Sequence, residues 1–293
     1  MNPCSVTNRA HRVAMRALAA SLLVLGSSGC GSAWRSAERA EPGATLATAS
    51  GRSVDELRRA AERADASAAD QVAYGERLFN GDGTGAGFDE AGAARWFAKA
   101  AQRGDPVGKM RLADCLASGR GAAIDRTRAL KLYREAADAG LAEARYSLGM
   151  CLADGLGTPG GAKDVREAAG LWESAAESGY APAQFRLALC RKNGEDGRPP
   201  DLESAFRWFQ RAANQGYGAA QANVGRAYLR GEGVAKDPEK AYMWSVIAIA
   251  HEAPLAKRTC DAAAKELTQP QIDEARRLAG EFRARPETSG GAR

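Results

Sequence analysis

An internal repeat constrains the fold of this chain more than any other feature. The segment SAFRWFQRAANQG (204–216) recurs as GAARWFAKAAQRG (92–104) and RALKLYREAADAG (128–140), with further copies at 167–179 and 240–252. A period of this length is typical of a solenoid, in which each unit buries its apolar face only against its neighbours. The aligned large residues recur every 36 to 39 positions, at Trp96, Leu132, Leu171, Trp208 and Trp244.

A second recurring segment lies between these copies. ARYSLGMCLADGLG (144–157) and AQANVGRAYLRGEG (220–233) are two examples, and related stretches stand at 72–83, 108–121 and 183–197. Small, aliphatic and large residues fall at helical spacing, so each copy presents one apolar stripe. The Gly-x-Gly that follows can adopt positive φ and turn the chain back. Each repeat is therefore predicted to be helix, glycine turn, helix, glycine turn.

The full pattern is best kept in AQANVGRAYLRGEGVAKDPEKAYMW (220–244) and resembles the Sel1-like repeat family, a relative of the tetratricopeptide repeats. The fourth copy departs from the pattern, because Arg191 stands at the tyrosine position and must be exposed or find a partner. The resemblance implies an all-α, right-handed superhelical solenoid of about five helix-turn-helix repeats, approximately 69–104, 105–140, 141–179, 180–216 and 217–252.

Segments on both sides of the repeats are predicted to cap the solenoid, since its terminal units must cover the last apolar face. At the N-terminal side, VDELRRAAERADA within 53–68 favours a capping helix. On the other side, 253–285 favours capping helices, with Thr268 as an N-cap and Pro270 inside the first turn. Residues 286–293 are predicted to form a disordered tail.

Arg9, Arg12 and Arg16 precede the apolar run ALAASLLVLG (17–26). This run is too short to span a bilayer as a stable helix and predicts a secretory signal peptide over 1–29. The small and polar residues of 30–52 then predict a flexible tether.

The junction SSGC (27–30) resembles the bacterial lipobox, which implies that Cys30 is lipidated and becomes the new N-terminus. The lipobox prefers Leu three residues before the cysteine, where this chain has Ser27. Cleavage by ordinary signal peptidase and an uncleaved anchor therefore stay open as alternatives. Because Gly31 rather than Asp follows, the resemblance implies an exported lipoprotein of the outer membrane that faces the periplasm.

The charge of the chain belongs mostly to its first segment. The formal net charge is +5, and removal of the three arginines in 1–29 reduces it to +2. The remainder has no basic stripe interleaved with aromatic residues, so nucleic-acid binding is not expected.

The sequence offers little for catalysis or metal binding. Beyond residue 29 the only histidine is His251, and no nucleophile is placed beside it by the sequence. The glycine-rich loop NGDGTGAGFDE (80–90) lacks the Lys-Ser/Thr of a phosphate loop and the twelfth-position Glu of a calcium loop. It is predicted to be a turn, and we expect no metal, no cofactor and no enzymatic activity.

Three cysteines share one repeat position, at Cys115, Cys151 and Cys190. Equivalent residues on stacked helices lie roughly 8–10 Å apart, whereas a disulfide needs Cα atoms within about 7 Å. These three cysteines are therefore predicted to be free and buried. Cys260 is also predicted to be free and buried, because it could reach only the last repeats, which contain no other thiol.

One face of the first helix of each repeat should line the concave groove, if the solenoid resembles tetratricopeptide repeats. Most of its residues in copies two to four are apolar, which suits an extended peptide or helix of a protein partner. Packing against neighbouring second helices is the alternative. The six candidate positions are Met110, Asp114, Tyr146, Met150, Phe185 and Leu189.

These features together predict a non-catalytic protein-interaction scaffold of the cell envelope, anchored to the membrane by lipid and binding along its concave surface. Some exported members of the resembled family are associated with β-lactam or cell-wall binding, which keeps a binding protein or enzyme of that kind open. No Ser-x-x-Lys motif occurs to support it. A cytoplasmic adaptor with an unprocessed N-terminus is the third alternative.

Overall fold

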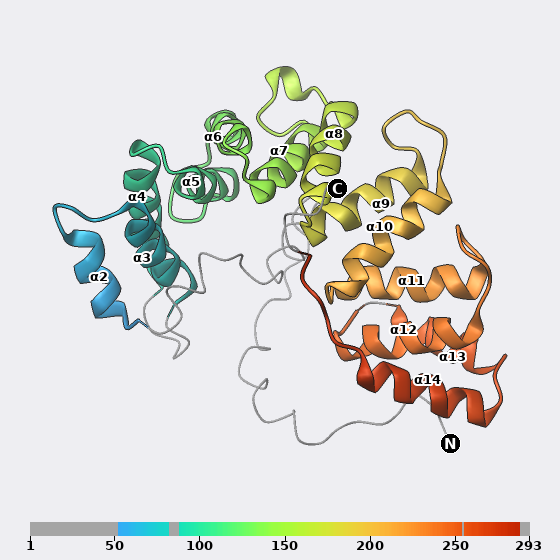
Figure 1. Cartoon of the computed structure of the whole chain (residues 1–293). Helices are drawn as coiled ribbons and strands as arrows, with labels where there is room; N and C mark the ends of the chain where they lie inside the picture. The colour runs from blue at the N-terminus through green and yellow to red at the C-terminus, as the bar shows by residue number, and fades with distance from the viewer. Residues whose placement is uncertain (1–51, 82–87, 254, 288–293) are drawn as a thin grey trace, which may run out of the picture. The chain divides into compact units, whose positions relative to one another are not determined.

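All regular structure in the described part of the chain is helical. The computed structural model describes residues 52–81, 88–253 and 255–287, which contain thirteen α-helices and the short 3-10 helix Pro159–Gly161 (Figure 1). This confirms the prediction of an all-α helical repeat solenoid. The predicted signal peptide, Cys30 and all but the last residue of the predicted tether lie outside these ranges, as do 82–87 of the glycine-rich loop.

The helices alternate along the chain as first and second members of repeated pairs. The first helices are α3 (Ala68–Asn80), α5 (Pro106–Ser118), α7 (Ala142–Asp154), α9 (Ala181–Asn193) and α11 (Gly218–Arg230). The second helices are α4 (Glu90–Gln102), α6 (Arg126–Asp138), α8 (Val165–Glu177), α10 (Leu202–Asn214) and α12 (Pro238–Ala250).

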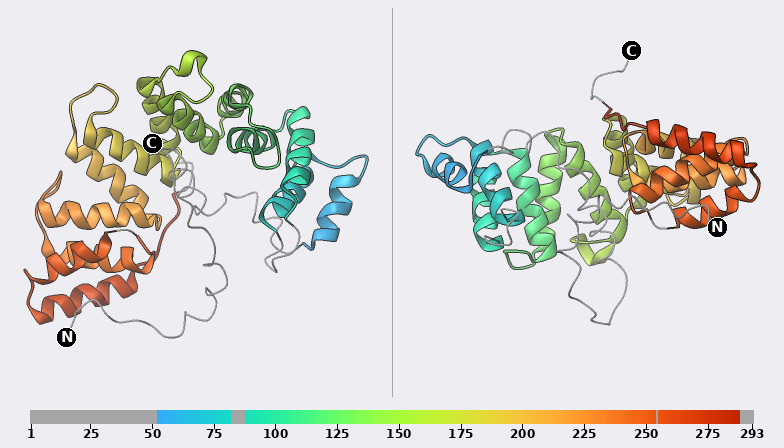
Figure 2. Two further views of the ribbon diagram at one scale, coloured as in Figure 1. Left: turned by 180° about the vertical axis from the view of Figure 1, so that it is seen from behind. Right: turned by 90° about the horizontal axis from the view of Figure 1, so that it is seen from below.

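The chain divides into two compact units. Among the described residues, the N-terminal unit comprises 52–201 together with 286–287, and the C-terminal unit comprises 202–285. The boundary falls between α9 and α10, the two helices of the fourth pair. Within the N-terminal unit, the second helices α6 and α8 lie on one side and the first helices α5 and α7 on the other (Figures 1 and 2).

Aspartates begin most of the second helices. The side chain of Asp125 accepts a hydrogen bond from the backbone N–H of Arg128 at 2.9 Å, and Asp164 accepts one from Glu167 at 2.8 Å. Each bond satisfies one of the four N–H groups that have no partner inside the helix. Because this aspartate recurs at 89, 125, 164 and 237, the start of the second helix is fixed at the same place in each of these repeats.

Within a repeat, a glycine in the first helix lets the second helix approach closely. A Cβ on Gly149 would lie 2.5 Å from Nε1 of Trp172, whose side chain is fully buried. The same indole N–H donates to the carbonyl oxygen of Tyr146 at 3.3 Å. The small residue and the large ring are therefore complementary parts of one contact.

Between repeats, the second glycine of the Gly-x-Gly turn touches the previous repeat. Gly157 adopts φ 79°, and a Cβ there would lie 2.2 Å from the carbonyl oxygen of Arg126, the first residue of α6. Gly121 makes the equivalent approach to Glu90, the first residue of α4. The turn therefore ends one helix and also sets the distance to the preceding pair.

The buried rings of the second helices are not the residues aligned from the sequence. Trp96, Leu132, Leu171 and Trp208 are only half-buried, and of the aligned set Trp244 alone is buried. The helix phase instead points the next residue into the core in the first four repeats, because that is the side that faces the small residue of the first helix. These buried rings are Phe97, Tyr133, Trp172 and Phe209.

Helices outside the repeats cover both ends. In the N-terminal unit, α2 (Val54–Glu62) buries Leu57 against Tyr74 of α3. In the C-terminal unit, α13 (Ala256–Ala264) and α14 (Gln269–Glu281) pack on α12, with Cys260 and Ile272 in their shared core. The C-terminal capping helices are confirmed.

Thr268 is the N-cap of α14, as predicted, and its backbone N–H donates to Oε1 of Gln271 at 2.9 Å. Beyond this helix, the predicted disordered tail starts at residue 286. The structure describes its first two residues, and Oε2 of Glu287 accepts a hydrogen bond from Nε2 of Gln184 at 2.9 Å. Residues 288–293 lie outside the described ranges.

Arg191 is buried and finds partners, the second of the two outcomes anticipated for it. Its guanidinium lies 2.7 Å from Oδ2 of Asp196 and 2.9 Å from Oε1 of Glu173. Two carboxylates thus compensate a charge at a position that the repeat pattern gives to tyrosine.

Cys115, Cys151, Cys190 and Cys260 form no disulfide with one another and are buried, as predicted. Burial raises the pKa of the Cys115 thiol to about 12 and also raises that of Cys190. Both thiols are therefore protonated and unreactive at neutral pH.

The substitution Gly157→Ala should destabilise the N-terminal unit by about 3 kcal/mol, since it adds a backbone clash to the cost of positive φ. Gly140→Ala is the matched control: Gly140 also has positive φ, but no atom of the described residues lies within 4 Å of its Cβ position. The control should cost about 1 kcal/mol. Urea unfolding followed by circular dichroism measures both, and equal costs would refute a contact role for Gly157.

Candidate functional site

The six predicted groove residues do not share one environment. Met110 is 1% exposed and belongs to the core of the N-terminal unit, so its predicted place in an accessible groove was wrong. The alternative of internal packing holds for this residue, because its side of α5 faces the core. The remaining five are half-buried on α5, α7 and α9: Asp114, Tyr146, Met150, Phe185 and Leu189.

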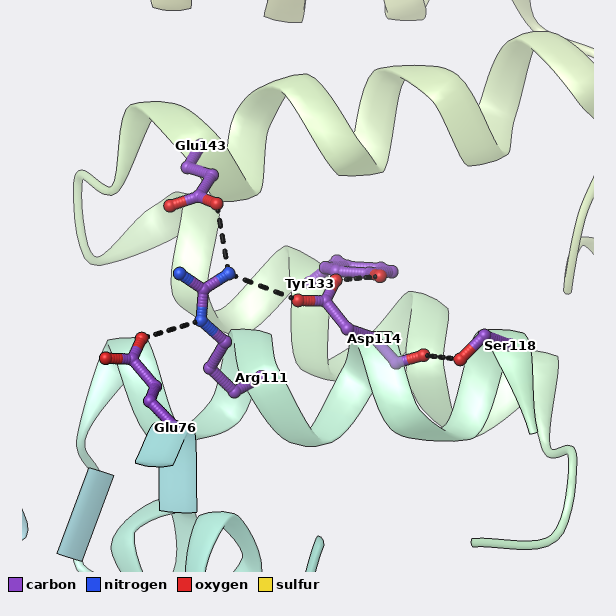
Figure 3. A network of polar contacts seen from close by, with 6 residues as sticks. All are labelled: Glu76, Arg111, Asp114, Ser118, Tyr133 and Glu143. Atoms are coloured by element: carbon purple, nitrogen blue, oxygen red, sulfur yellow. Dashed lines mark hydrogen bonds and ion pairs between the residues drawn. The ribbon is translucent and has the colours of Figure 1, made fainter. Parts of the chain in front are cut away.

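Arg111 joins three first helices through carboxylates (Figure 3). Its Nε lies 3.1 Å from Oε1 of Glu76 on α3, and its Nη1 lies 3.0 Å from Oε1 of Glu143 on α7. The same Nη1 is 3.4 Å from Oδ2 of Asp114, one turn along α5. Arg111 therefore connects three successive repeats at one face.

The network is well shielded but reachable by solvent. The side chain of Glu76 is 6% exposed, whereas those of Arg111 and Glu143 are 19% and 30% exposed. Burial by itself disfavours the guanidinium charge, but the three surrounding carboxylates raise the pKa of Arg111 above its ordinary value. Three carboxylates around one guanidinium leave an excess of negative charge when all are ionised.

Asp114 contacts a tyrosine hydroxyl as well as Arg111. Oδ1 accepts a hydrogen bond from the Tyr133 hydroxyl at 2.6 Å. Burial raises the pKa of Asp114 to about 6, and Glu143 adds to the rise, whereas Arg111 and the Tyr133 hydroxyl act against it. The site therefore contains a carboxyl group that titrates just below neutral pH.

Aromatic residues continue the face toward α9. The rings of Tyr146 and Tyr180 meet edge to face, with centroids 5.6 Å apart. Burial raises the pKa of the Tyr180 phenol, and the negative charge of Glu143 adds to this rise. We call the half-buried side chains of this region the first-helix face: Arg111, Asp114, Glu143, Tyr146, Met150, Tyr180, Phe185 and Leu189.

Several members of the site were missed from the sequence. Glu76 occupies in the first repeat the position that Asp114 occupies in the second, so comparison of all copies had the signal to find it. The contact between Arg111 and Glu143 has no such signal, because it depends on how two helices of different repeats are stacked. Tyr133 was missed because the alignment assigned the large position to its neighbour, Leu132.

His251 has a structural environment in the C-terminal unit. Its Nδ1 lies 2.8 Å from Oε1 of Gln221 and 3.1 Å from the carbonyl oxygen of Ile247. Within 52–81, 88–253 and 255–287, no group of three His, Cys, Asp or Glu side chains is arranged to hold a metal ion. None of the helices in those same ranges has the length and apolar character needed to cross a membrane.

Comparison with known proteins identifies the repeat. A family model described as Sel1 repeat matches more than half of the chain, so the protein belongs to the Sel1 repeat family. None of the curated proteins matches the sequence. The matched segments are residues 68–105, 106–141, 142–180, 181–217 and 218–250.

One solved structure with a TM-score above 0.5 shows the same fold. A Sel1 repeat protein from Oxalobacter formigenes has a TM-score of 0.61 and 28% identity, covering 70% of this chain and 57% of that chain. A protective antigen of uropathogenic Escherichia coli with an SLR fold has a TM-score of 0.40 and 22% identity, covering 78% and 63%. This chain thus spans about three fifths of the length of either protein. Sel1 repeat proteins generally mediate protein–protein interactions, and the family is typically non-catalytic.

The raised pKa of Asp114 gives the stability a defined pH dependence. The folded state holds this proton more tightly than the unfolded chain, where the pKa is about 3.9, so stability is lost as pH rises from about 4 to about 6. The substitution Asp114→Asn should therefore cost more stability at pH 4 than at pH 7, by about 1–3 kcal/mol.

Urea unfolding of both proteins at the two pH values measures this difference. With Asp114 retained, the single substitution Tyr133→Phe should move the titration of Asp114 to higher pH. The hydrogen bond that it removes stabilises the ionised carboxylate. A cost of Asp114→Asn that is the same at pH 4 and pH 7 would rule out the raised pKa.

Proposed function

We propose that this protein is a non-catalytic scaffold of the bacterial cell envelope that binds a protein partner along the first-helix face. The observation that carries the proposal is the composition of this face in the N-terminal unit. It combines half-buried apolar residues, such as Met150 and Leu189, with the polar network centred on Arg111. Membership of the Sel1 repeat family supports a protein rather than a small molecule as the ligand.

The face has the properties that binding would use. Met150, Phe185 and Leu189 offer adaptable apolar contacts that lose water on binding. The network around Arg111 joins α3, α5 and α7, so it keeps these helices in register without a ligand. In a tetratricopeptide-like solenoid this face lies on the concave side, where affinity is spread over several repeats.

A lipid on Cys30 would hold the scaffold at the membrane. The proposal rests on the signal-like run of 17–26, the small residues before Cys30 and the polar stretch that follows. An outer-membrane anchor facing the periplasm is the location that this arrangement favours, with Gly31 after the cysteine.

The protein interaction is tested with the double substitution Met150→Glu and Leu189→Glu in full-length protein, crosslinked in intact cells and then captured. Two carboxylates on the first-helix face should abolish capture of envelope proteins, because an apolar contact would have to bury unpaired charge. Ile124→Glu is the control, since Ile124 is an exposed apolar residue between α5 and α6. The proposal fails if both variants, shown by circular dichroism to be helical, capture the same proteins as wild type.

The lipid anchor is tested by mass spectrometry of protein extracted from membranes. The mature chain should begin at Cys30 and carry acyl chains, and Cys30→Ser should remove both the added mass and the membrane association. Cys4→Ser changes a cysteine within the predicted signal peptide and should alter neither. A mature chain that begins elsewhere and carries no lipid would exclude the anchor.

A further inference from the structure

A glycine turn precedes each first helix from α5 onward. In some repeats a non-helical segment of the chain packs against this turn, and in others no described segment does. In the C-terminal unit, Cβ of Ala284 lies 3.1 Å from the position that a Cβ on Gly216 would take, and the N–H of Arg285 donates to the carbonyl oxygen of Asn214 at 2.9 Å. In the N-terminal unit, Cβ and the carbonyl oxygen of Glu287 both lie 3.1 Å from the corresponding position on Gly179. Two repeats thus accept a non-helical segment against this turn.

The side chain five residues after the turn glycine fixes the docked segment in the N-terminal unit. Gln184 stands five residues after Gly179, and its Nε2 donates both to Oε2 of Glu287 at 2.9 Å and to the carbonyl oxygen of Ala176 at 3.1 Å. The recognition therefore has two parts, a close approach to glycine and a hydrogen bond to a carboxylate.

The second and third repeats begin with the same turn, and no other described segment of the chain lies on it. Among residues 52–81, 88–253 and 255–287, no other atom lies within 4 Å of the Cβ positions of Gly104 and Gly140. Five residues after these glycines stand Lys109 and Arg145, both cationic, where the fourth repeat has Gln184. We call these four residues the open turn surface. Its charge is complementary to the carboxylate that the fourth repeat binds.

Arg145 is the member of this surface that no carboxylate of the described residues pairs with. Lys109 already pairs with Glu135 of the second helix at 2.9 Å. Ser174 occupies the position equivalent to Glu135 in the next repeat. Within the part of the chain that the structure describes, the half-buried side chain of Arg145 has no ion pair or hydrogen bond. A half-buried guanidinium without a carboxylate is unusual, because its five donors favour carboxylate oxygens and can bind them in pairs.

We propose that the open turn surface binds an extended acidic segment of a partner protein, with a Glu or Asp side chain on Arg145 and the backbone of the segment across Gly140. The mode of docking is the one that Glu287 uses on Gly179 and Gln184. The exchange of glutamine for arginine converts a neutral donor into a charged one, which strengthens the hydrogen bond to a carboxylate and makes it salt-dependent. This inference names the chemistry of a partner segment and rests on the proposed function only in taking that partner to be a protein.

Fluorescence anisotropy tests the proposal with full-length protein and a labelled, amidated peptide of alternating alanine and glutamate. The peptide should bind wild type, bind more weakly as salt is raised, and lose about tenfold in affinity with Arg145→Ala. A peptide of alternating alanine and glutamine should bind far more weakly, since it cannot accept a charge-assisted bond. Arg128→Ala, which removes an exposed arginine from α6, is the matched control and should bind as wild type does.

Arg145→Gln installs the residue of the fourth repeat and should bind with intermediate affinity and less salt dependence. The proposal is overturned if no acidic peptide binds wild type, if the two peptides bind equally, or if Arg145→Ala and Arg128→Ala behave alike. Self-association that Arg145→Ala abolishes, without peptide binding, would assign the surface to a second copy instead and also overturn it. These variants leave the first-helix face unchanged. A failure of peptide binding would therefore not affect the outcome of the capture experiment with Met150→Glu and Leu189→Glu.

Discussion

The close approach of the two helices in each pair is the contact on which the other features depend. Where the first helix carries glycine, as at Gly149, the large ring of the second helix reaches its backbone, and Trp172 is completely buried as a result. The turn glycine Gly157 then lets the chain pack closely against the first residue of α6 in the preceding pair. One small residue sets the packing inside a pair, and another sets the distance between pairs. A larger residue at either place would push backbone apart, since few side-chain movements can relieve such a contact.

This spacing determines what the first helices can present. Because α3, α5 and α7 are held at fixed separations, one arginine can reach carboxylates on all three, and Asp114 can meet both Arg111 and the Tyr133 hydroxyl. The polar network leaves apolar residues such as Met150 beside it at intermediate exposure. A face of this kind suits protein binding, since it is ordered before the partner arrives and pays little entropy on association.

Much of this architecture could be predicted from the sequence, because the contacts that determine it involve residues at fixed spacing along the chain. The period, the helix length and the glycine turns follow from residues that recur at fixed spacing. The lack of disulfides among Cys115, Cys151 and Cys190 follows from their equivalent positions in the repeats. Met110 was predicted to line the groove but is buried, because an apolar stripe gives the direction of a side chain only to within part of a helical turn. The core extends around α5 far enough to include Met110. The ring alignment was one residue out for the same reason, as Tyr133 and not Leu132 faces the core. The pairing of Arg111 with Glu143, and the docking of Glu287 on Gln184, depend on stacking and on chain returning from far along the sequence. No local pattern encodes either contact.

The central claim is that the N-terminal unit recognises a protein through its first helices. Hydrogen–deuterium exchange of the full-length chain, with and without a partner captured from cells, tests it most directly. The account predicts slower exchange on binding in α5, α7 and α9 and in the turns before them, with α6 and α8 unchanged. Protection confined to α6 and α8 would contradict it and assign recognition to the opposite side of the repeats.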